Sequence, residues 1–151
     1  MERAQVTAAP SKLTPEQWKR IEDALGFAYG SAELEVDGYR LLLRVAHVGP
    51  LKLKITPFVN GWMRGEWLGK ECEERRRFFR PVVLRLFSHA DKAKWIKACG
   101  KKRAYEMFEL DKTRTYWFFA WPSFGPLKRH LVKHNASIRL VSINGTEEPQ
   151  S

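Results

Sequence analysis

The dipeptide Asp37-Gly38 stands between two segments whose composition is typical of strands. On its N-terminal side Leu34 and Val36 alternate with glutamates, and the largely apolar run Tyr39–Val48 follows it. An Asp-Gly pair in this setting is a strong signal for a two-residue hairpin, because both residues tolerate a positive φ. The sequence therefore predicts two antiparallel strands joined at residues 37 and 38.

A helix is predicted before this hairpin. Thr14 can accept a hydrogen bond from a free backbone amide, Gln17 stands at the capping-box position, and Pro15 suits the first helical turn. Gly30 is a suitable stop. The apolar residues between them recur at helical spacing and form one face: Trp18, Ile21, Leu25 and Ala28.

The remaining sequence adds four strands and two helices. Strands are expected over residues 51–55, 82–87, 113–121 and 137–143, and helices over residues 88–99 and 125–134. The first of these helices opens on a capping box at Ser88, with Trp95, Ile96 and Cys99 expected to face inward. Aromatic residues occupy both faces of the segment 113–121, which is typical of a central strand covered on both sides. The predicted fold class is α+β: a mostly antiparallel sheet of five to seven strands packed with about three helices in a single domain.

A chain of 151 residues suits one domain. We expect a flexible N-terminal tail over residues 1–12, one α+β domain over residues 13–144 and a flexible C-terminal tail over residues 145–151. The first residues lack the apolar core of a secretory signal, and no apolar run reaches the roughly 20 residues of a membrane span. We therefore expect a cytoplasmic protein that does not engage a membrane.

Positive charge is concentrated in the middle of the chain. Residues 39–103 hold seventeen Lys and Arg against five Asp and Glu, within a chain of formal net charge +10. A field of this kind attracts phosphates or acidic protein faces. The plain alternative is a solvated surface with no partner.

Two clusters supply the candidate binding residues. In the first, arginines and phenylalanines share six consecutive positions: Arg75, Arg76, Arg77, Phe78, Phe79 and Arg80. Arginine forks pair with phosphate oxygens, and aromatic faces stack on unpaired bases. The second cluster lies on and after the predicted helix over residues 88–99: Lys92, Lys94, Lys97, Lys101, Lys102 and Arg103. Two tryptophans in a glycine-punctuated segment are further stacking candidates, namely Trp62 and Trp67.

The sequence contains only weak signals for a metal site, a disulfide or a catalytic site. His130 and His134 have the spacing of a metal-binding pair on a helix, but no third ligand is indicated, so we expect neither a metal nor a cofactor. Cys72 and Cys99 are interpreted as ordinary thiols. No nucleophile, phosphate-loop or dinucleotide motif is present, and we assign no catalytic residue.

The leading functional prediction is a non-enzymatic basic protein that binds nucleic acid or a nucleic-acid-handling complex through this Arg/Lys-rich, aromatic-interleaved surface. The alternative is an inhibitor or adaptor, of the kind found among phage and mobile-element accessory proteins, that binds an acidic face of another protein. An enzyme whose site is assembled from distant residues comes third, because such a site leaves no local motif.

Overall fold

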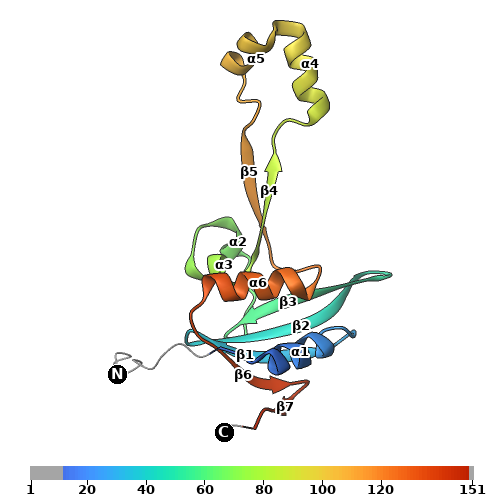
Figure 1. Ribbon diagram of the computed structural model, residues 1–151, viewed down its shortest axis with the longest axis vertical. Coiled ribbons are helices and arrows are strands. Elements are labelled where there is room, and N and C mark those ends of the chain that lie inside the picture. Colours follow the sequence, from blue (N-terminus) through green and yellow to red (C-terminus); the bar gives the residue numbers. More distant parts are fainter. Residues whose placement is uncertain (1–11, 150–151) are drawn as a thin grey trace. The chain divides into compact units, whose positions relative to one another are not determined.

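A computed structural model describes residues 12–149 of the chain (Figure 1). The chain divides into two compact units: unit 1 comprises the residues up to Arg80 and from Phe118 onward, and unit 2 comprises Pro81–Trp117. The predicted α+β fold class is confirmed, since unit 1 holds a five-stranded antiparallel sheet with helices and a separate two-stranded sheet is also present. The predicted N-terminal tail lies outside the described residues except for Lys12.

The sheet of unit 1 has the strand order β3-β2-β1-β6-β7. Asp37 and Gly38 form the predicted hairpin turn, with φ angles of 46° and 90°. β2 pairs antiparallel with both β1 and β3, so the three strands form a meander. β7 lies within the segment predicted as a C-terminal tail. The strands are β1 (Ser31–Val36), β2 (Tyr39–Gly49), β3 (Lys52–Val59), β6 (Ile138–Ile143) and β7 (Thr146–Glu147).

One face of this sheet carries the core of unit 1. Leu34 of β1 is fully buried between its register partners Leu41 of β2 and Leu140 of β6. Helices α1 (Pro15–Ala24) and α6 (Phe124–His134) pack their apolar residues on this side. The opposite face carries charged side chains, because polar residues alternate with the buried ones along β1 and β2.

Helix α1 begins at the predicted capping box. The Gln17 amide donates to the Thr14 hydroxyl over 3.1 Å, and the Thr14 amide donates to the Gln17 side chain over 3.0 Å. The helix ends at Ala24, before the predicted stop at Gly30. Gly30 is required for another reason, because a Cβ atom there would lie 1.9 Å from the Ala24 carbonyl oxygen.

Two short helices follow β3 in unit 1: α2 (Glu66–Gly69) and α3 (Glu73–Phe78). No helix is predicted from the sequence in this segment, where residues 60–70 favour a structured loop or a short hairpin. In the described part of the chain, no helix is both long enough and apolar enough to cross a membrane.

Unit 2 is a two-stranded sheet whose strands lead into a pair of helices (Figure 1). The strands are β4 (Arg80–Arg85) and β5 (Thr113–Phe118), and the helices are α4 (His89–Cys99) and α5 (Lys101–Met107). Gly100, with a φ of 83°, joins the two helices. The Ser88 hydroxyl caps α4 by accepting from the Asp91 amide over 3.1 Å, as the sequence predicts.

A small aromatic core holds unit 2 together. Trp95 and Phe108 lie 4.4 Å apart between ring centroids, and Phe87 lies 6.3 Å from the same Phe108 ring. Ala104 and Leu110 are buried, with exposures of 0% and 1%. The predicted inward position of Trp95 is consistent with this packing.

The expectation of a doubly covered central strand over residues 113–121 is wrong. β5 ends at Phe118, pairs with β4 alone, and is exposed along most of its length. Phe119 and Trp121 instead enter the packing of unit 1, where Trp121 is 3% exposed and donates its ring N–H to the Phe78 carbonyl over 3.0 Å. The alternation predicts a strand, but tertiary neighbours decide whether its faces are covered.

Candidate nucleic-acid interface

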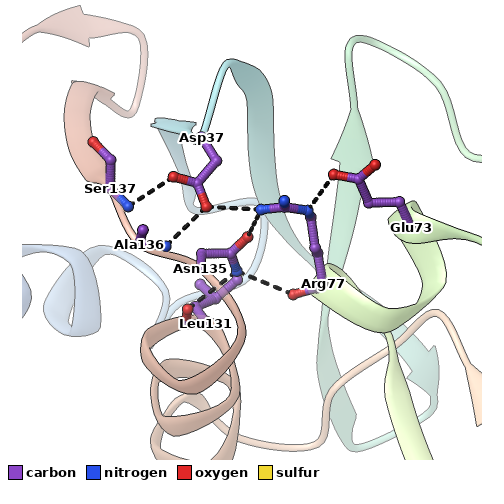
Figure 2. Close-up of polar contacts among 7 residues, drawn as sticks. All are labelled: Asp37, Glu73, Arg77, Leu131, Asn135, Ala136 and Ser137. Carbon is purple, nitrogen blue, oxygen red and sulfur yellow. Dashed lines mark hydrogen bonds and ion pairs between the residues drawn. The ribbon is translucent and has the colours of Figure 1, made fainter. Parts of the chain in front are cut away.

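The first predicted cluster lies on α3 and the two residues after it. Arg77 is engaged on several sides (Figure 2): its Nε donates to Glu73 over 2.7 Å, and its Nη1 donates to Asp37 over 2.7 Å and to the Asn135 side-chain oxygen over 2.9 Å. Asn135 in turn donates to the Arg77 carbonyl over 3.3 Å. Arg77 therefore links α3 to the β1-β2 turn and to the residue after α6.

The carboxylate of Asp37 has further donors (Figure 2). It accepts from the backbone amides of Ala136 and Ser137, both over 2.8 Å. Burial favours a higher pKa for Asp37, but these amides and Arg77 outweigh it and hold the pKa below its usual value. Since its guanidinium is committed to these partners, Arg77 serves the fold in this structure, which differs from its predicted role in binding a partner.

The stacking role predicted for Phe78, Phe79 and Trp67 is corrected by the structure. Both phenylalanines are 0% exposed, and Trp67 is 8% exposed. The Phe79 ring centroid lies 5.7 Å from that of Trp67 and 4.9 Å from that of Phe119. A base cannot reach these rings because they form part of the core of unit 1. The neighbouring arginines suggested an exposed segment, but α3 turns its last residue inward.

Trp62 is the stacking candidate that retains an open face. Its side chain is 59% exposed, and the Arg64 guanidinium lies 4.9 Å from its ring centroid. Of the arginines in the first cluster, Arg76 is exposed, whereas Arg75 and Arg80 are half-buried. The first cluster is thus less available than its sequence suggests.

Five of the six residues of the second cluster form what we call the α4-α5 basic surface. Its five members are exposed, and none of them makes an ion pair with another residue of the described chain: Lys94, Lys97, Lys101, Lys102 and Arg103. Lys94 and Lys97 face outward because α4 turns the stripe with Trp95 and Ile96 inward. The other three residues stand in the first turn of α5 and are likewise exposed.

Lys92 belongs to the inward side of α4 and not to this surface. Its ammonium donates to the Asp111 carboxylate and lies 5.5 Å from the centroid of the Tyr105 ring. These contacts, the Asp111 hydrogen bond above all, raise the pKa of Lys92. Lys92 thus joins α4 to the segment before β5, in place of its predicted role in binding a partner.

Unit 2 carries further positive charge that sequence reasoning did not assign to a site. Across residues 81–117 there are nine Lys and Arg against four Asp and Glu. Arg85 of β4 and Arg114 of β5 are exposed, and neither makes an ion pair with a described residue. Both arginines lie in segments that the sequence predicts as strands, and this placement is the sequence signal that could have identified them.

The two histidines of α6 lie together, with 4.2 Å between ring centroids. His130 bonds the Arg76 carbonyl over 2.9 Å, and since a carbonyl only accepts, its Nε2 carries the proton. Burial, supported by His134 and Lys133, lowers the pKa of His130 to about 4. Among residues 12–149, no group of three His, Cys, Asp or Glu is placed to hold a metal ion.

The two thiols, Cys72 in unit 1 and Cys99 in unit 2, are free and half-buried.

These features describe an α+β protein that presents an exposed basic pair of helices. No protein family, curated protein or solved structure matches the chain.

Proposed function

We propose that this protein is a non-enzymatic nucleic-acid-binding protein whose α4-α5 basic surface contacts phosphates. The observation that carries the proposal is that five cations lie exposed on two consecutive helices and pair with no carboxylate of the described residues. Like charges held close together repel one another, and a polyanion that releases its own counterions relieves this repulsion.

The composition of α4 supports a contact with a phosphate backbone. Ala90, Ala93 and Ala98 lie exposed among the lysines. Because their side chains are short, a nucleic-acid strand can approach the helix closely. Lysines bind phosphates as point charges, and contacts to phosphates carry no base-sequence information directly. We therefore expect binding that depends strongly on salt and weakly on base sequence.

The test is binding of labelled single-stranded RNA, single-stranded DNA and duplex DNA, measured by fluorescence anisotropy as salt is raised. The test variant changes four residues of the surface to alanine: Lys97, Lys101, Lys102 and Arg103. Each lost phosphate contact reduces the slope of log K against log salt by about 0.9 on duplex DNA and about 0.7 on single strands. Four lost contacts should therefore reduce the slope by roughly 3.

A matched control removes four exposed lysines of unit 1 and has the same net charge: Lys12, Lys19, Lys70 and Lys133 to alanine. We expect the control to keep most of the slope. Equal losses in the two variants would mean that net charge alone governs binding, and absence of binding to all three nucleic acids would end the proposal.

A second candidate function is favoured by apolar side chains in unit 2. Val83, Leu84 and Leu86 are 62%, 48% and 42% exposed, which is more typical of a protein contact than of a phosphate contact. On this alternative the protein is an adaptor or inhibitor that binds an acidic protein face. Recovery of a defined partner that survives nuclease treatment, and that is lost in a Leu84→Glu variant, would favour this function over the first.

A further inference from the structure

A groove runs between α1 and α6 in unit 1. Two adjoining hollows of about 260 and 430 Å³ form it, and Trp18 and Lys128 line both of them. The Lys128 ammonium lies 5.1 Å from the centroid of the Trp18 ring, and Phe124 packs on the same tryptophan at 6.0 Å between centroids. The groove thus has a tryptophan at its centre with a lysine held over it.

The floor of the smaller hollow is apolar. Leu13 and Trp18 are each 8% exposed and Ile138 is 4% exposed, whereas Val132 at the edge is 47% exposed. The volume of this hollow lies below the roughly 300 Å³ at which pockets for small molecules begin. It therefore suits one large apolar side chain better than a whole cofactor.

The walls of the groove carry a positive charge. Lys12 lines the smaller hollow, Arg129 lines the larger one, and Lys128 is shared; none of the three makes an ion pair with a described residue. Lys19 also lines the larger hollow, but its ammonium lies 3.1 Å from the Asp23 carboxylate. The acid in the lining is Glu22. A ligand that complements these walls is therefore anionic.

We propose that this groove binds an acidic segment of a partner protein, which inserts one large apolar side chain into the smaller hollow and sets carboxylates against Lys12, Lys128 and Arg129. A phosphate backbone would use the cations but not the apolar floor. Base stacking on Trp18 is blocked because that ring is nearly buried and lies under Lys128. The inference concerns unit 1 alone and does not depend on the α4-α5 basic surface.

The probe is a short fluorescent peptide with a single phenylalanine among glutamates, titrated with the full chain in an anisotropy assay. Because an acidic peptide is also attracted to the α4-α5 basic surface, the assay uses the alanine variant of Lys97, Lys101, Lys102 and Arg103 beside the unmodified protein. We expect both proteins to bind the peptide, and we expect the peptide with its phenylalanine replaced by alanine to bind at least about tenfold more weakly.

Two substitutions in the groove test its location. Lys128→Glu reverses the shared charge and Val132→Glu places a carboxylate at the edge of the smaller hollow; each should weaken binding of the peptide about tenfold or more. Leu51→Glu and Lys52→Glu are the matched controls, since both residues are exposed in unit 1 and line neither hollow. Thermal melts identify any variant that loses its fold.

Three outcomes would overturn the inference: no binding of the peptide, equal effects of groove and control substitutions, or loss of binding only in the α4-α5 variant. Displacement of the peptide by single-stranded RNA from the α4-α5 variant, with the same dependence on Lys128, would assign the groove to nucleic acid instead. None of these results decides whether the α4-α5 basic surface binds nucleic acid, so the two proposals fail separately.

Discussion

Arg77 and Asp37 form an ion pair of 2.7 Å across 40 positions of sequence, with side-chain exposures of 21% and 19%. The sequence predicts Asp37 in the hairpin turn because it tolerates a positive φ, but its carboxylate also accepts from two backbone amides just before β6. Asp37 therefore occupies the β1-β2 turn and also binds α3, through Arg77, and the connection from α6 to β6.

Replacing Arg77 by alanine should destabilise unit 1 by about 2 kcal/mol, because the half-buried Asp37 loses its charged donor and the exposed Glu73 loses its partner on the same helix. Urea unfolding followed by tryptophan fluorescence measures the loss. Arg76→Ala is the matched control, since Arg76 is exposed on the same helix; its effect should stay within about 0.5 kcal/mol. Similar effects of the two substitutions would contradict the structural role assigned to Arg77.

Stability should fall as the pH is lowered from about 6.5 to about 4. The pKa of His130 falls from its usual value of 6.5 to about 4 in the folded state, so in this window the unfolded chain binds a proton that the folded chain does not. After allowance for partial solvent access the loss is on the order of 2 kcal/mol. His134, whose pKa is also lowered mainly by burial, adds to it.

His130→Gln supplies the control for this pH dependence, because an amide can still donate to the Arg76 carbonyl but does not titrate. Urea unfolding at several pH values should show a smaller loss for this variant than for the unmodified protein. Asp37 does not interfere: its pKa is lowered from 3.8, so its contribution is retained above that pH and lost below it. An unchanged dependence between pH 6.5 and 4 in the variant would refute the assignment.

The features that sequence reasoning recovered are those determined within a few residues. The Thr14 capping box, the Asp37-Gly38 turn and the Ser88 cap depend on local hydrogen bonds and backbone angles. The α4-α5 basic surface could be predicted for a similar reason, because the helical periodicity places Lys94 and Lys97 on a different face from Trp95.

The features that it missed depend on distant partners. Nothing near Arg77 in the sequence indicates that its acceptors include Asp37 and Asn135, and nothing near Phe79 indicates that Trp67 and Phe119 enclose it. The groove between α1 and α6 was missed for the same reason, because its walls are more than a hundred positions apart in the sequence.

Gly30→Ala should destabilise the protein by about 2 to 4 kcal/mol or prevent folding. The new Cβ atom would lie 1.9 Å from the Ala24 carbonyl oxygen, so the end of α1 and the start of β1 would have to separate. Gly26→Ala is the matched control, because the nearest atom to a Cβ there is 3.4 Å away. Thermal unfolding compares the stabilities of the two variants. If the Gly30→Ala protein were as stable as the Gly26→Ala protein, residue 30 would not lie as close to the Ala24 carbonyl as the structure places it.

Trp62→Ala should weaken binding to single-stranded RNA or DNA while leaving duplex binding nearly unchanged, if the proposed nucleic-acid function holds. Trp62 is 59% exposed with Arg64 beside its ring, and a base stacked on such a ring contributes about 1–3 kcal/mol, which is roughly 5- to 150-fold in affinity. Trp62→Phe should retain most of the binding, since it keeps an aromatic face. Tyr29→Ala is the control, because Tyr29 is another exposed aromatic residue of unit 1, 75% exposed. Equal losses in the Trp62→Ala and Tyr29→Ala variants, or a loss on duplex DNA as large as on single strands, would exclude a specific stacking role for Trp62 and leave the α4-α5 basic surface as the sole candidate contact.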